Sequence, residues 1–363
     1  MVLEVAADIW TFLFYQVPSH VRVVDFGIRH WSGHLKCVWN KTPTVILGHS
    51  GHFPLSLMCL LQACRRISRG LAMSAVKRSL IGVCQLSSTG DKKHNFRECE
   101  RLVREGVERG ACMLFLPEAF DYIASSTEET LQLAETLEGE VVQRYCQLAR
   151  ETGVWLSLGG FHERGPDWER DRRIYNTHLL LNEAGQIAGL YRKAHLFDVD
   201  LKGHVSLNES SFTIPGPQIE PPVATPIGKI GLTICYDLRF PEISLALAAA
   251  GAEVLTFPSA FTVTTGMAHW EPLLRSRAIE TQSYVVAAAQ TGRHNVGRSS
   301  YGHSLVVDPW GCVLAQCGQG PGLCCALIDL DYLCQLRRQM PLAQHRRRDL
   351  YGAVGACPQT HNL

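Results

Sequence analysis

Three residues with reactive side chains each follow an apolar, strand-like run. Glu118 closes "MLFLPE", Lys193 follows "GLYR", and Cys235 closes "KIGLTIC". A thiol, a carboxylate and an ammonium are the groups that a cysteine nucleophile, its general base and an oxyanion-binding cation require. We expect burial to raise the pKa of Glu118 toward the range of a general base. We also expect the start of the following helix to lower the pKa of the Cys235 thiol.

Each of these residues also has a simpler structural interpretation. A strand-end cysteine is unremarkable in a chain with 14 cysteines, Glu118 could cap a helix or meet solvent in a loop, and Lys193 could be a solvated strand end. The three residues strengthen one another because their types match one reaction. Their sequence spacing alone does not bring them together.

Composition excludes several classes of protein. Lys and Arg total 35 against 34 Asp and Glu, so no net field favours nucleic acid or an anionic membrane. We find no apolar run that reaches the ~20 residues of a spanning helix. The cysteines are irregularly spaced without a CxxC pair, so a metal site is the least favoured reading. We expect most of them to be reduced and buried.

Hydrophobic periodicity predicts the elements that must position these residues. Buried strands alternate with amphipathic helices, and one hairpin turns at residues 183–185. This pattern predicts a layered α/β fold with mixed sheets. The expected strands are 79–86, 111–118, 154–161, one ending at Cys235, 253–260, 284–290, 301–311 and 322–330, with helices at 91–110, 138–152, 241–251 and 269–282 and the hairpin at 174–193.

The first 74 residues show no sustained periodicity. Residues 58–74 are apolar, Arg-rich and free of acidic residues, as organellar presequences are, and Met73 is an in-frame methionine before the first strand. We expect an N-terminal extension over 1–74 that is poorly ordered or targeting, a domain over 75–351 and a tail over 352–363. A targeting role or an internal start predicts cytoplasmic and mitochondrial forms. The basic run 345–352 is an oligomer contact at most.

The segments "FLPEAF", "YRKAHLFD" and "GLTICYDLRFPE" resemble, in order, the three signature segments of the nitrilase superfamily of carbon–nitrogen hydrolases. The resemblance spans about residues 79–351. It implies a four-layer α-β-β-α sandwich, a homodimer or higher homo-oligomer, and no metal or organic cofactor. The implied site residues are Glu118 as general base, Lys193 as oxyanion cation, Cys235 as nucleophile, the Tyr236 N–H as second oxyanion donor, and Glu209 as the carboxylate that positions the lysine and the hydrolytic water.

Three further stretches, 156–169, 264–294 and 301–311, resemble the Nit branch of this superfamily. The resemblance implies an amidase that hydrolyses deaminated glutathione to 2-oxoglutarate and cysteinylglycine through a thioester. Three alternatives stay open: an omega-amidase acting on 2-oxoglutaramate, a true nitrilase, and an interaction protein that retains the fold.

A small amide substrate that carries carboxylates needs a cation near the nucleophile. Arg239, four residues after Cys235, is the candidate, because a guanidinium grips a carboxylate bidentately. Its structural alternative is an ion pair with Asp237 or Glu242. Phe261 and Thr265 are weaker candidates for the substrate pocket, and we expect His269 and Trp270 to pack at a helix start.

Overall fold

The computed structural model describes residues 78–201 and 205–352. All of these belong to one compact unit, which spans Leu71–Leu363. The predicted N-terminal extension over 1–74 and the tail beyond Gly352 lie outside the described residues. No helix within the described ranges is both long and apolar enough to cross a bilayer.

The first sheet is built around three parallel strands, β1, β2 and β3. All four residues of β2 are buried, which explains why its sequence is continuously apolar rather than alternating. The sheet order is β13-β12-β1-β2-β3-β4-β5, and β16 also pairs with β1. Its strands are β1 (Arg78–Leu86), β2 (Met113–Leu116), β3 (Trp155–Glu163), β4 (Tyr175–Leu181), β5 (Ile187–Arg192), β12 (Ala289–Arg293), β13 (Ser299–Tyr301) and β16 (Gly322–Asp329).

The second sheet also has a parallel centre, β9, β10 and β11, with antiparallel strands at both edges. Its order is β15-β14-β11-β10-β9-β8, and a separate hairpin pairs β6 with β7. The strands are β6 (Asp198–Leu201), β7 (Val205–Asn208), β8 (Val223–Thr225), β9 (Gly228–Leu232), β10 (Val254–Thr256), β11 (Tyr284–Ala287), β14 (Leu305–Val307) and β15 (Val313–Gln316).

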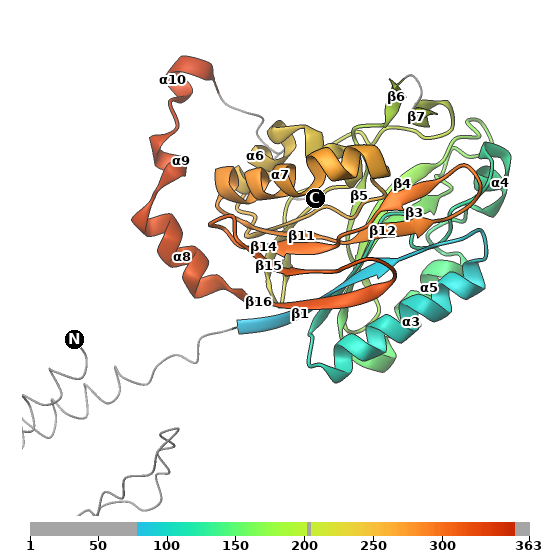
Figure 1. Cartoon of the computed structure of the whole chain (residues 1–363), viewed down its shortest axis with the longest axis horizontal. Helices are drawn as coiled ribbons and strands as arrows, with labels where there is room; N and C mark the ends of the chain where they lie inside the picture. The colour runs from blue at the N-terminus through green and yellow to red at the C-terminus, as the bar shows by residue number, and fades with distance from the viewer. Residues whose placement is uncertain (1–77, 202–204, 353–363) are drawn as a thin grey trace, which may run out of the picture. The chain divides into compact units, whose positions relative to one another are not determined.

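Helices cover the outer faces of the two sheets (Figure 1). One hydrophobic core lies between the first sheet and helices α3 and α5, and the other fills the space between the sheets and under α6 and α7. This arrangement confirms the predicted four-layer α-β-β-α sandwich. The helices are α3 (Lys92–Glu108), α4 (Thr127–Leu133), α5 (Glu140–Thr152), α6 (Pro241–Ala249), α7 (Val263–Thr281), α8 (Leu330–Gln339), α9 (Leu342–His345) and α10 (Arg348–Tyr351), with 3-10 turns η1 (Glu209–Ser211) and η2 (Cys235–Arg239).

Two predicted boundaries are wrong in ways that matter for the site. Strand β9 ends at Leu232, and Cys235 begins η2 instead of closing the strand. Helix α7 starts at Val263 rather than at residue 269, because the Thr262 side chain accepts a hydrogen bond from the Thr265 N–H and caps the helix six residues earlier. His269 and Trp270 therefore lie inside α7 and not at its start.

The described cysteines differ in how far they are buried. The ten cysteines in the described chain are all free thiols. Four of them, Cys84, Cys99, Cys146 and Cys317, are buried, whereas Cys312 and Cys334 are exposed. The other four described cysteines are half-buried, and four of the 14 lie outside the described residues, so the prediction that most cysteines are buried stays a prediction.

Candidate active site

The site forms where the carboxyl ends of parallel strands from both sheets meet. Glu118 follows β2 of the first sheet, whereas Cys235 follows β9 and Ala260 follows β10 of the second. Lys193 is the residue directly after β5, which ends at Arg192. The structure thus brings together residues that are far apart in the sequence, and Glu209 of η1 joins them.

Lys193 is the centre of the charged cluster. Its ammonium donates to Oε1 of Glu118 at 3.0 Å and to Oε1 and Oε2 of Glu209 at 3.1 and 2.9 Å. All three side chains are buried. Burial alone would lower the pKa of Lys193, but the two carboxylates outweigh it and raise that pKa well above its usual value. Lys193 is therefore a permanent cation.

Donors surround both oxygens of the Glu118 carboxylate. Besides Lys193, Asn176 donates its Nδ2–H to Oε1 at 2.8 Å, and the Ala260 N–H donates to Oε2 at 2.9 Å. The main chain is fixed as well, since the side-chain amide of Gln290 donates to the Glu118 carbonyl at 2.9 Å. This carboxylate is thus held in one orientation.

The expected pKa of Glu118 needs a correction. Burial does raise it, but Lys193 and hydrogen bonds from Lys193 and Cys235 outweigh burial, so the pKa of Glu118 lies below its ordinary value. The exposed Arg298 adds a smaller effect in the same direction. Glu118 is consequently ionised at neutral pH and available as a base.

The expectation for Cys235 is also wrong. Its thiol pKa is raised, first by burial and then by the Glu118 charge, while Lys193 only partly opposes them. The helix expected to lower it, α6, begins only at Pro241. At rest the cluster therefore holds a neutral thiol hydrogen-bonded to an ionised carboxylate.

The backbone at Cys235 departs from the extended conformation of the preceding strand. Cys235 has a φ of 46°, a left-handed conformation that costs a non-glycine residue about 1–3 kcal/mol. The Cys235 N–H donates to the Pro258 carbonyl at 2.9 Å, and the Asp237 carboxylate accepts from the Ile234 N–H at 2.9 Å. These two hydrogen bonds hold the strained turn.

Asp237, read from the sequence as structural, is fully buried and saturated with donors. It accepts from the Tyr191 hydroxyl at 2.7 Å, from the His195 N–H at 3.1 Å and from His195 Nδ1 at 2.7 Å, in addition to the Ile234 N–H. It therefore ties the nucleophile turn to the segment that carries Lys193.

An aromatic wall with one guanidinium lies beside the nucleophile. The Arg239 guanidinium lies over the rings of Tyr236 and Phe261, 5.7 and 5.4 Å from their centroids. It also contacts Nδ1 of His269 at 3.2 Å. The structure thus places Arg239 and Phe261 together and adds His269. Thr265 is mostly buried, and its hydroxyl lies 2.8 Å from that of Thr262 in the cap of α7.

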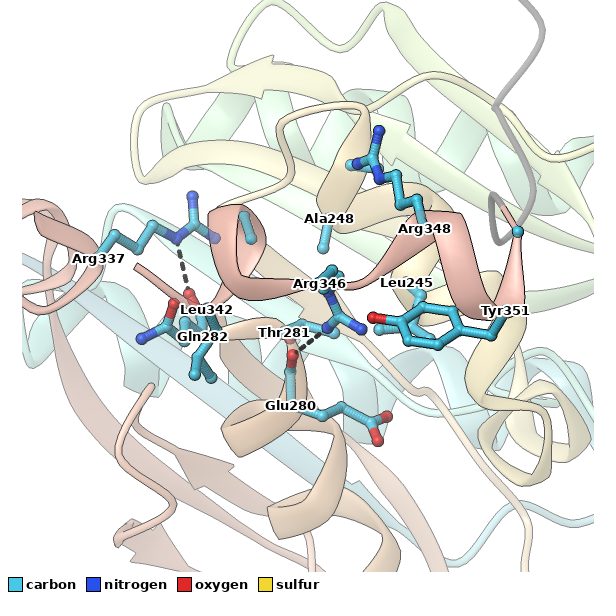
Figure 2. Close-up of a pocket in the computed structure, with 13 residues that line it drawn as sticks. Leu245, Ala248, Glu280, Thr281, Gln282, Arg337, Leu342, Arg346, Arg348 and Tyr351 are labelled. Atoms are coloured by element: carbon cyan, nitrogen blue, oxygen red, sulfur yellow. Dashed lines mark hydrogen bonds between the residues drawn. The ribbon is translucent and has the colours of Figure 1, made fainter. Parts of the chain in front are cut away.

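The cavity drawn in Figure 2 is a separate feature. It is lined by α6, the end of α7 and the C-terminal segment, and Arg346 donates there to the Glu280 carbonyl at 2.7 Å. None of the predicted site residues lines it. Across residues 78–201 and 205–352, no three His, Cys, Asp or Glu side chains gather so that they could hold a metal ion.

Sequence reasoning missed two residues that contact Glu118, namely Asn176 and Gln290. Asn176 belongs to "YNTH", a polar run at the start of the otherwise apolar strand β4, which was a usable sign. Gln290 ends the apolar run "YVVAAAQ" and is completely buried. A buried amide with its own partners is a common structural feature, so this position carried no comparable sign.

Comparison with known proteins gives a consistent result. Residues 80–338 match the family model described as carbon-nitrogen hydrolase. The chain is 60% identical to human deaminated glutathione amidase over 301 residues, which is 83% of this chain and 91% of the human protein. In structure it is similar to the NitFhit protein of C. elegans, with a TM-score of 0.72 at 50% identity, covering 76% of this chain and 66% of that one.

A second similar structure shows a cysteine adduct. It is a mutant of the amidase from Nesterenkonia sp. AN1, with the acetamide moiety of fluoroacetamide added covalently at the active-site cysteine. Its TM-score is 0.61 at 26% identity, covering 75% of this chain and 95% of that one. Taken with the family model and the human relative, the geometry leads to one conclusion: the chain belongs to the carbon–nitrogen hydrolase family.

Proposed function

We propose that this protein is a cysteine-dependent amidase in which Cys235 is the nucleophile, Glu118 the general base and Lys193 the oxyanion cation. The observation that carries the proposal is the buried cluster in which an ionised Glu118 contacts both Lys193 and a protonated Cys235. These are the protonation states needed before attack.

The reaction follows from this resting state. Glu118 takes the thiol proton as Cys235 Sγ bonds to the amide carbon. Glu118 then gives that proton to the leaving amine as the C–N bond breaks, which leaves a thioester on Cys235. The same carboxylate removes a proton from a water molecule that attacks the thioester, and the thiol recovers its proton on release of the acid product.

Lys193 and the Tyr236 N–H would stabilise the oxyanion of each tetrahedral intermediate. A donor of this kind contributes a factor of about 10²–10³ to kcat. Glu209 holds Lys193 through both carboxylate oxygens and also accepts from the Phe197 N–H at 2.7 Å. This geometry supports the positioning role for Glu209, and we assign the hydrolytic water to it as well.

The substrate we propose is deaminated glutathione, and its products are 2-oxoglutarate and cysteinylglycine. The support is the 60% identity to the human enzyme named for this activity, together with the Arg239 guanidinium over the rings of Tyr236 and Phe261. Arg239 would bind a substrate carboxylate bidentately. Phe261 would form the wall of the substrate pocket next to Arg239. Thr265, at the start of α7, would be a further residue of this pocket.

Turnover assays test this function. Purified protein should hydrolyse deaminated glutathione with a higher kcat/KM than 2-oxoglutaramate, and a simple nitrile should release no ammonia. Cys235→Ala should have no activity on any of the three. A preference for 2-oxoglutaramate would refute the substrate assignment, and residual amidase activity in Cys235→Ala would refute the mechanism.

We also propose that the protein forms a homo-oligomer through α7 and the turn before β15. Met267 of α7 is 71% exposed, and Ile279 and Trp310 add exposed apolar surface to this part of the molecule. The Arg275 side chain of α7 donates to the Gly311 carbonyl at 2.8 Å, which places α7 beside the turn of Trp310, and exposed apolar side chains on neighbouring elements are typical of subunit interfaces. Light scattering should give a dimer or larger for the wild type and a smaller species for Met267→Glu.

For localisation, we propose one mitochondrial and one cytoplasmic form, on the strength of the Arg-rich segment 58–74 and the internal Met73. A fluorescent fusion of the full chain should reach mitochondria, and the fusion that starts at Met73 should stay in the cytoplasm. Identical distributions of the two fusions would refute this proposal.

A further inference from the structure

Asn176 contacts the charged cluster through both its side chain and its main chain. It lies near the start of β4, where its backbone pairs with His162 of β3. Its carbonyl accepts from the Lys193 N–H at 2.9 Å. Its side-chain Nδ2 donates to Oε1 of Glu118 at 2.8 Å and lies 3.5 Å from Oε1 of Glu209. One residue thus touches all three charged members of the site.

The two oxygens of the Glu118 carboxylate have different hydrogen-bond partners. Oε1 accepts from both Lys193 and Asn176, whereas Oε2 accepts from the Ala260 N–H. The segment after β10 contacts both groups, since its Pro258 carbonyl accepts from the Cys235 N–H and its Ala260 N–H donates to Oε2. Oε2 is therefore the oxygen positioned to take the thiol proton.

The orientation of the Asn176 amide is set by charge. Turning it over would place Oδ1 against the carboxylates of Glu118 and Glu209, so Nδ2 must face them. Oδ1 is then buried without a hydrogen-bond partner in the described part of the chain. Leaving such an oxygen unpaired costs about 1–3 kcal/mol. This cost falls on the same amide group that donates to Glu118.

Gly160 leaves room for this amide. It has a φ of 141°, and a Cβ there would lie 2.9 Å from Oδ1 of Asn176 and 2.9 Å from Cα of Glu118. The register of β3 against β4 shifts at this point, between Gly159 and Phe161. The irregularity in the sheet and the missing side chain therefore let Asn176 and Glu118 pack closely.

We propose that Asn176 is a positioning residue for the amide hydrolysis, whose carboxamide holds Oε1 of Glu118 and so directs Oε2 at the Cys235 thiol. This inference rests on the proposed function. The charged or titratable groups that face Glu118 are Lys193 after β5, Glu209 in η1, Cys235 in η2 and Arg298 in the β12–β13 loop. Asn176 contacts Glu118 as well, and its side chain does not titrate.

The test is the pH profile of kcat/KM for deaminated glutathione with Asn176→Asp and Asn176→Ala. Aspartate adds a carboxylate to the cluster that already holds Glu118 and Glu209. The acid limb should therefore move up by about one pH unit or more. The kcat of this variant at pH 7 should fall about 10- to 100-fold with KM nearly unchanged. Alanine removes the donor without adding charge, so its limb should move up less and its kcat should fall about 10-fold.

The matched control is Asn182→Asp, the same change at the turn of the same hairpin. The Oδ1 of Asn182 accepts from the N–H groups of Ala184 and Gln186, and aspartate keeps this acceptor while losing only the exposed hydrogen bond from Nδ2 to Oε1 of Gln186. Its pH profile and kcat should match the wild type within about twofold. A purely structural role for Asn176 would lower activity at every pH without moving the acid limb, and that result would overturn the inference.

A second readout separates this inference from the proposed function. The alkylation rate of Cys235 by iodoacetamide, followed by peptide mass spectrometry, depends on proton transfer to Glu118 but not on amide turnover. Its pH dependence should shift in both Asn176 variants as the acid limb does. If the wild type turns over no amide, the proposed function fails while alkylation still decides the role of Asn176. If the wild type is active and neither profile moves, the inference about Asn176 fails alone.

Discussion

At the scale of single residues, the balance of charge around Lys193 sets the resting state of the site. Two buried carboxylates share one ammonium, and the excess negative charge is offset by neutral donors from Asn176 and Ala260. The thiol stays protonated because burial and the nearby Glu118 charge both disfavour the thiolate. Attack and proton transfer must therefore be coupled, which is the reason the base lies in contact with the nucleophile.

This charge balance predicts the effect of Glu118→Gln. The variant keeps the shape of the side chain but loses the base, so kcat should fall by a factor of about 10²–10⁴. In this variant an NH2 group takes the place of Oε2 and faces the Ala260 N–H, which is also a donor. The lost hydrogen bond should lower the free energy of unfolding by about 1–2 kcal/mol. Steady-state kinetics and urea unfolding measure the two effects. Activity within about tenfold of the wild type would contradict the assignment of the base.

The pH dependence of activity follows from the same two groups. The pKa of Glu118 is lowered, so its carboxylate is ionised throughout the neutral range, and the thiol pKa of Cys235 is raised, so the thiol stays protonated there. The active combination should persist, and kcat/KM should be flat between about pH 5.5 and 8.5. A sigmoidal rise centred between pH 6 and 7 would mean that another group, such as a histidine, supplies the base.

At the scale of elements, the nucleophile turn depends on Asp237. It accepts four hydrogen bonds, and Asp237→Asn would set an amide N–H against donors from Tyr191 and Ile234 or from His195. We expect the free energy of unfolding to fall by about 2–4 kcal/mol and kcat to fall with it, because the Cys235 turn loses its support.

Asp349→Asn provides the comparison for that variant. Asp349 is exposed and pairs with Arg347 two residues away, so its loss should leave the free energy of unfolding close to that of the wild type. Urea unfolding followed by circular dichroism measures both variants. Equal effects at the two positions would show that the buried network of Asp237 does not stabilise the turn.

Much of the element pattern was predictable because buried parallel strands leave a strong signal. The strand 111–118 and the hairpin 174–193 were located correctly to within a few residues, and both carry site residues. The start of α7 was missed because the sequence pattern, with Pro272 inside the helix, does not reveal that Thr262 is the cap. The hairpin of β6 and β7 has only four residues in each strand and left no periodicity to detect.

The site was predictable in its residue types and not in its electrostatics. Glu118, Lys193, Cys235 and Glu209 were all named from motifs, and the structure brings them into one cluster. The directions of both pKa shifts were wrong, because they depend on distances between segments that sequence spacing does not contain. Asn176 was missed although the polar run at the start of β4 gave a sign of it.

At the scale of the whole molecule, two histidines are buried as neutral groups, and one of them links the two sheets. His178 of β4 lies 2.7 Å from the Ser157 hydroxyl in the same sheet, and its Nδ1 lies 3.0 Å from the Thr233 carbonyl after β9 of the other sheet. His294 lies between the Ser88 carbonyl and the Ser300 hydroxyl. Burial is the main cause that lowers the pKa of each histidine to about 4.

These histidines predict acid sensitivity of the fold. Their pKa values are lower in the folded state than in the unfolded chain, so stability is complete above about pH 6.5 and is lost as the pH falls toward 4. Each histidine should remove about 3 kcal/mol over that range. In His178→Asn, where the amide N–H replaces Nδ1–H, stability at pH 7 should fall but its loss between pH 6.5 and 4 should be about halved. Urea midpoints at several pH values decide this, and an unchanged slope would contradict it.

The central claim is that amide hydrolysis proceeds through a thioester on Cys235. Its most direct test is mass spectrometry of the enzyme quenched in acid during turnover of deaminated glutathione. We predict a 2-oxoglutaryl adduct on the peptide that contains Cys235, absent before substrate is added and absent in Cys235→Ala. Product formation with this peptide unmodified, or with the acyl group on another of the ten described cysteines, would contradict the account.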